Sequence, residues 1–185
     1  MATTAKGTPY VESSDLVANY PAVSLALAEH IDDFGGKVLQ VVRATDTTLR
    51  STTSETLVDA TGMSVTITPQ KSDSKIVLIF SYSLRIYGKQ NDYQYSLFRI
   101  ADSSNNAISG AENHTYYTRY IVTGSSSTSP DFAMPMTLVA YDTPGSTAAK
   151  TYKLRFASGL PGGTIAVFLR NTDVTAQMFA IEVSA

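Results

Sequence analysis

Two histidines, sixteen acidic residues and the absence of cysteine limit the chemistry open to this 185-residue chain. A Ser-His-Asp triad needs a histidine beside a nucleophile, and neither His30 nor His114 has a GxSxG or related neighbourhood. Without cysteine, thiol catalysis, disulfides and cysteine-based zinc sites are excluded. The acids show neither a catalytic pair nor a calcium loop, and no glycine loop indicates phosphate binding. We therefore expect no enzyme, no catalytic residue, no metal and no cofactor; a carbohydrate-processing enzyme is the remote alternative.

One group of residues stands out for binding. Seven tyrosines lie between positions 82 and 120, together with three arginines. A tyrosine on a β-surface can stack on a sugar ring or fill a subunit interface, because it has an apolar body and a polar tip. Two interpretations stay open: contacts in the core or between subunits, and a surface for a host glycan or protein. The candidate receptor surface comprises Tyr87, Asp92, Tyr116 and Tyr117.

The N-terminal segment, residues 1–36, carries the one helical signal of the sequence. Residues 1–15 are small and polar and predict an extended arm, and Pro21 favours the first turn of a helix that ends near Gly35. Its apolar positions recur at steps of three and four, which predicts one stripe: Leu16, Tyr20, Val23, Leu27, Ile31 and Phe34. Because a lone helix of three turns is marginal in water, it must dock, either on its own β-domain or on further copies or a larger assembly.

Residues 37–185 alternate with period two between turn signals, with no helical segment among them. Eight to ten strands predict an all-β antiparallel sandwich that resembles a jelly roll. Apolar or aromatic residues occupy every second position from Ile76 to Ile86, so they lie on one face of a strand. This one-face set is the longest in the chain and indicates a central strand. The turn chemistry at Thr61-Gly62 predicts a break between two strands.

Composition restricts the partners. Charged residues make up 16% of the chain, below the roughly 25% typical of soluble proteins, which favours a surface partly covered by a sister subunit. A net charge of −2 gives no sign of the basic surface that nucleic-acid binding requires. The N-terminus lacks the apolar core of a signal peptide, and no apolar run is long enough to insert in a membrane.

Several stretches resemble a β-domain of tailed-bacteriophage virion proteins, many of them tail fibres. The stretch GKVLQVVRATDTTLRSTTSETLVDATGMSVTITPQKSDSKIVLIFSYS is similar to the domain's opening, in which LVDATGMSVTITP reads as a hairpin, and IAVFLRNTDVTAQMFAIEVSA to its final strands. Upstream, SSDLVANYPAVSLALAEHIDD resembles segments that join such proteins to the virion. The resemblance covers residues 12–86 and 150–185, and residues 87–149 match nothing in it.

The resemblance implies a homotrimer with a jelly-roll or C1q-like fold, located in the virion and assembled in the host cytoplasm. It implies a tail fibre or receptor-binding component. The helical stripe is then expected to serve virion attachment or trimerisation, and the expected virion partner is a tail, baseplate or major capsid protein. The alternative is a capsid decoration protein, either a cement protein or a head fibre.

Overall fold

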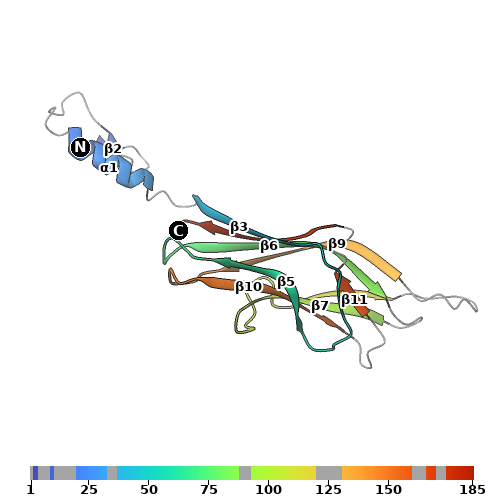
Figure 1. Ribbon diagram of the computed structural model, residues 1–185. Helices are drawn as coiled ribbons and strands as arrows, with labels where there is room; N and C mark the ends of the chain where they lie inside the picture. The colour runs from blue at the N-terminus through green and yellow to red at the C-terminus, as the bar shows by residue number, and fades with distance from the viewer. Residues whose placement is uncertain are drawn as a thin grey trace, which may run out of the picture.

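The computed structural model describes residues 2–3, 9–10, 20–32, 37–87, 93–119, 131–159, 166–169 and 174–185 (Figure 1). The N-terminal part holds two short paired strands, β1 (Ala2–Thr3) and β2 (Pro9–Tyr10), and the helix α1 (Tyr20–Asp32), which lies beside β2. In Figure 1 this part stands apart from the strands that follow. The helix α1 has Pro21 in its first turn, whereas most of the expected extended arm, residues 1–15, lies outside the described residues.

Ten strands follow in the described residues: β3 (Val38–Asp46), β4 (Arg50–Thr52), β5 (Val58–Ile67), β6 (Lys75–Tyr87), β7 (Tyr93–Asp102), β8 (His114–Arg119), β9 (Asp131–Asp142), β10 (Lys150–Ser158), β11 (Ala166–Leu169) and β12 (Ala176–Val183). All of their pairings are antiparallel. One sheet has the order β5-β10-β7-β8, and the other has the order β3-β12-β6-β11-β4 with β9 on the opposite side of β6.

The order of the long strands identifies the architecture. When the short strands β4 and β11 are left out, the other eight strands from β3 to β12 can be counted one to eight along the chain. In this count the sheet β3-β12-β6-β9 has the order 1-8-3-6. The sheet β5-β10-β7-β8 has the order 2-7-4-5. Two interlocked Greek keys of this kind make the eight-stranded jelly roll. The expected jelly-roll-like antiparallel sandwich is confirmed.

The core lies between the two sheets, and β6 is its central strand. Every second residue of β6 from Ile76 to Ile86 is buried, as the one-face set predicted. The Phe80 ring stacks on Tyr82 with centroids 4.5 Å apart, and Tyr82 meets Phe98 of the other sheet at 5.1 Å. Aromatic pairs of this geometry add stability beyond the area they bury, so they tie the two sheets together.

The prediction for residues 57–69 was wrong in one respect. Instead of a hairpin turning at Thr61-Gly62, the segment forms the single strand β5. Gly62 has φ +88°, a conformation that costs glycine little, and the pairing with β10 shifts register beside it. Lys153 pairs with Ser64 but Arg155 pairs with Asp59, so β5 holds three extra residues here and both Ala60 and Met63 face the core. The glycine therefore marks a β-bulge.

Candidate interaction surface

The outward side of the β3-β12-β6-β9 sheet carries apolar residues in two rows. The paired positions of the first row are Val41, Ile181, Val77 and Tyr141, and those of the second are Arg43, Phe179, Ile79 and Val139. We call the seven uncharged residues of these rows the apolar face. The guanidinium of Arg43 lies 5.8 Å from the centre of the Phe179 ring. No described element covers these rows.

The exposure of this face is unusual for a monomer. Val41 and Val139 each keep 55% of their surface exposed, and Tyr141 keeps 47%. Single exposed apolar residues are ordinary, but a contiguous apolar patch on a soluble protein marks an interaction site. The apolar face is therefore a candidate interaction surface.

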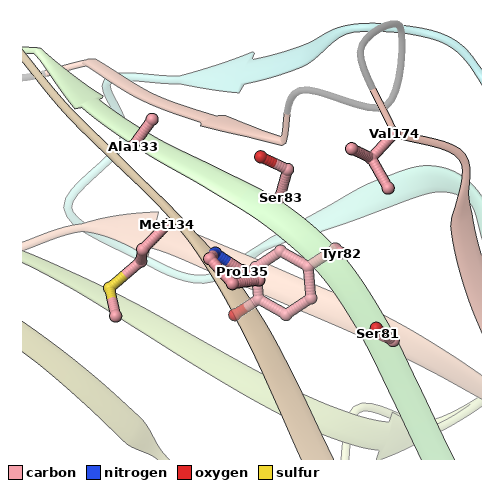
Figure 2. A pocket seen from close by; sticks show the side chains of 7 residues that line it. All are labelled: Ser81, Tyr82, Ser83, Ala133, Met134, Pro135 and Val174. Atoms are coloured by element: carbon pink, nitrogen blue, oxygen red, sulfur yellow. The ribbon is translucent and has the colours of Figure 1, made fainter.

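A hollow of about 360 Å³ continues this face along β6 and β9 (Figure 2). Its lining consists mostly of small or compact side chains, namely Ser81, Tyr82, Ser83, Ala133, Met134, Pro135 and Val174. Pro135 has no amide hydrogen to donate, which is tolerated in an edge strand, and β9 pairs only with β6 among the described strands. The hollow is thus a shallow, largely apolar depression at the sheet edge, and its lining shows no grouping of catalytic side chains.

The outward side of the other sheet has the opposite character. The carboxylate of Asp59 on β5 accepts hydrogen bonds from Lys153 Nζ at 2.7 Å and from Arg155 Nε at 2.9 Å. Arg99 on β7 pairs directly with Arg155 and donates from Nε to the Glu112 carbonyl oxygen at 2.5 Å. The hydrogen bond from Lys153, followed by its charge and that of Arg155, lowers the pKa of Asp59. We call Asp59, Arg99, Lys153 and Arg155 the charged patch.

The ionisable groups nearest the core stabilise the fold. Burial raises the pKa of Glu182, but hydrogen bonds outweigh it and the net pKa is lowered. Those bonds come from Gln40 Nε2 at 2.5 Å and from the backbone amide of Gln70 at 2.7 Å. Asp142 accepts from the Tyr152 hydroxyl at 2.6 Å, and burial together with this contact raises the pKa of Tyr152. Glu182 therefore holds the β5–β6 turn, and Asp142 ties β9 to β10.

His114 Nε2 lies 2.6 Å from the Gly110 carbonyl oxygen in a loop contact. In the part of the chain that the structure describes, no three His, Asp or Glu side chains are grouped so that they could hold a metal ion. Within that same part, no helix is long and apolar enough to cross a membrane.

The predicted helical stripe lies partly within α1. Tyr20, Val23, Leu27 and Ile31 belong to the helix, and Leu16 and Phe34 lie outside the described residues. Leu27 is 36% exposed, and Leu25, which the stripe omitted, is 60% exposed. Their role in attachment or trimerisation stays a prediction, but exposed leucines on a short helix still call for a partner surface.

Three candidate receptor residues, Tyr87, Tyr116 and Tyr117, lie toward the end of the sandwich remote from the start of β3. Tyr87 is the last residue of β6, while Lys75 at the start of that strand pairs with Val183 beside β3. Tyr116 and Tyr117 lie on β8 opposite Ser96 and Tyr95, where the structure describes their backbone alone. Asp92 falls outside the described residues. The receptor role of the four stays a prediction.

Sequence reasoning missed the apolar face, although a signal was present. Residues 76–80 read Ile-Val-Leu-Ile-Phe, and residues 138–141 read Leu-Val-Ala-Tyr, without alternation between apolar and polar. A strand that is apolar on both sides is typical of a sheet covered on both faces. The continuous runs therefore already indicated that the outward sides of β6 and β9 are apolar.

Comparison with known proteins gives no match to a family model and no match among curated proteins. Solved structures that match include one titled "Structure of infectious bursal disease virus Gx strain", at 13% identity and a TM-score of 0.33. Another, a D431N mutant VP2 protein of infectious bursal disease virus from T=1 particles, matches at 15% identity and a TM-score of 0.29. Each alignment covers 79% of this chain and 36% of the viral chain, so this chain spans little more than a third of those proteins' length.

Proposed function

We propose that this protein is a non-enzymatic structural subunit of a tailed-phage virion, a homotrimeric tail fibre or receptor-binding component anchored by its N-terminal segment. The single observation that carries the proposal is the apolar face, which gives the sandwich one side suited to association. The resemblance of residues 12–86 and 150–185 to phage virion domains supplies the setting and the trimeric state. A jelly roll without a grouped catalytic site in its described residues suits such a role.

The dimensions of the sheet fit a stable subunit contact. Four strands spaced by about 4.8 Å, with their edges, span about 19 Å, and strands of 8, 9, 12 and 13 residues rise about 35 Å on average. Their product is about 670 Å², of the order of the roughly 800 Å² that each partner contributes to a standard interface. The partner with the best chemical match is another copy, and in a closed trimer the apolar face of each subunit packs against a neighbouring subunit around a three-fold axis.

The polarity of the molecule suits attachment at one end and recognition at the other. The helix α1, with Leu25 and Leu27 exposed, precedes β3 at the end where Val38 and Val183 pair. Tyr87 and the predicted receptor residues of β8 lie toward the opposite end. A fibre needs its anchor and its receptor-binding residues at opposite ends, because the virion protein bound at the anchor must leave the receptor-binding residues accessible.

Amine cross-linking of the intact virion tests this placement, because Lys6 and Lys37 flank the anchor. We expect both lysines to form cross-links to a tail or baseplate protein. Cross-links confined to the major capsid protein would show a decoration protein instead. Lys153, on the charged patch, is the internal control and should give no cross-link to either anchoring protein.

A further inference from the structure

The charged patch contains an arrangement that costs stability. Arg155 on β10 and Arg99 on β7 are directly paired on the outward side of their sheet. Like charges at directly paired positions of an antiparallel sheet destabilise it. Within the described part of the chain, Asp59 is the carboxylate that binds Arg155, and it also binds Lys153. Asp59 thus pairs with two cations, and Arg99, the third cation of the patch, lies beside Arg155 without an ion pair to Asp59.

Arg99 keeps donors available at this surface. Its Nε binds the Glu112 carbonyl oxygen and lies 3.3 Å from Asn113 Oδ1. No described residue accepts a hydrogen bond from its two Nη groups. A guanidinium fixed through Nε presents its remaining N–H groups in a rigid fork, which matches a carboxylate or sulfate.

An aromatic ring lies farther along the same strand face. Tyr95 precedes Arg99 by four residues, so both point outward, about 13 Å apart along β7. The ring packs against Gly159: a Cβ at that position would lie 1.8 Å from Tyr95 Cδ2. The Gly159 amide also donates to the Tyr95 carbonyl oxygen at 2.8 Å. The glycine therefore lets the ring lie close against the sheet, a placement suited to stacking with a sugar ring.

We propose that the outward side of the four-stranded sheet binds an acidic polysaccharide. Arg99 and Arg155 bind its acidic groups, and Tyr95 stacks on a sugar ring several units along the chain. The function given to this site rests on the proposed receptor-binding role. Binding of the polysaccharide itself does not require the apolar face. In a trimer that buries the apolar face, the charged patch lies on the other side of each sandwich.

Binding of the full-length protein to immobilised alginate, a polyuronate, tests the site, with neutral dextran as the control polymer. We expect alginate to bind at least about tenfold more tightly than dextran. Arg99→Gln and Arg155→Gln should each weaken alginate binding about tenfold, the loss expected for a hydrogen bond to a charged group. Tyr95→Leu, which still covers Gly159, should weaken it as well. Raising the salt to 1 M should reduce binding strongly.

Lys71→Gln is the matched control, because it removes one positive charge from the turn between β5 and β6 and should leave the affinity unchanged. Arg99→Lys keeps the charge but loses the fork, so the affinity should fall less than with glutamine. Absence of alginate binding, equal binding to dextran, or an equal loss with Lys71→Gln would overturn the proposal. A monomer that binds alginate through these arginines would refute only the subunit association.

Discussion

At the scale of single residues, the charged patch on the outward side of one sheet contrasts with the apolar face on the outward side of the other. Asp59 holds two cations on the four-stranded sheet, whereas the two apolar rows contain one charged residue, Arg43. Because the two sheets share one core, this difference cannot arise from burial inside the subunit. It indicates that the two outward surfaces have different surroundings.

The ion pairs of Asp59 should make stability depend on pH. Its pKa in the folded protein is lowered, so the stabilisation is present above the unfolded-state pKa of about 3.9 and is lost as the pH falls through the folded value. We expect Asp59→Asn to lower the melting temperature at pH 6 to 8, and the difference from the unmodified protein to shrink below about pH 4. Calorimetry across this range measures it.

The control for that experiment is Asp73→Asn, which removes an exposed carboxylate that has no ion pair among the described residues. It should change the melting temperature less than Asp59→Asn at neutral pH. A difference between Asp59→Asn and the unmodified protein that stays constant down to pH 2 would mean that the carboxylate charge contributes nothing to stability.

At the scale of elements, the sequence predicted strands well because alternation and turn residues act locally. The buried set from Ile76 to Ile86 places β6 in the centre of a sheet without further information. The bulge at Gly62 could not be predicted in this way, because a glycine with positive φ fits both a turn and a bulge. The choice depends on pairing with β10, which is distant in sequence.

The helix α1 is predicted to be separable from the sandwich. Its described neighbour is β2, and strands β3 to β12 supply a complete core of their own. Deleting residues 1–34 should therefore leave 37–185 folded, with an unchanged β-type circular dichroism spectrum and a melting temperature within a few degrees. The same deletion should abolish incorporation into the virion. An insoluble truncated protein, or one that is still incorporated, would contradict the role given to the helix.

At the scale of the whole molecule, the sequence could predict the sandwich but not the location of its binding surfaces. A surface depends on which strands become neighbours, and Val41, Ile181, Val77 and Tyr141 come from four strands spread along the chain. The predicted tyrosine surface came from crowding in the sequence instead. Its members Tyr116 and Tyr117 pair with Ser96 and Tyr95, so the strand they share is the edge strand of the sheet that carries the charged patch.

The mass of the protein in dilute solution, measured by light scattering at micromolar concentration, tests association through the apolar face most directly. We expect about 60 kDa, three times the chain mass of 19.9 kDa, for a closed trimer. Val139→Asp places a charge on the apolar face at a residue that is 55% exposed in the single subunit, so it should give folded monomers. Ser64→Asp, on the outward side of the other sheet, should remain trimeric. An unmodified protein near 20 kDa, or a Val139→Asp variant that stays trimeric, would contradict association through the apolar face.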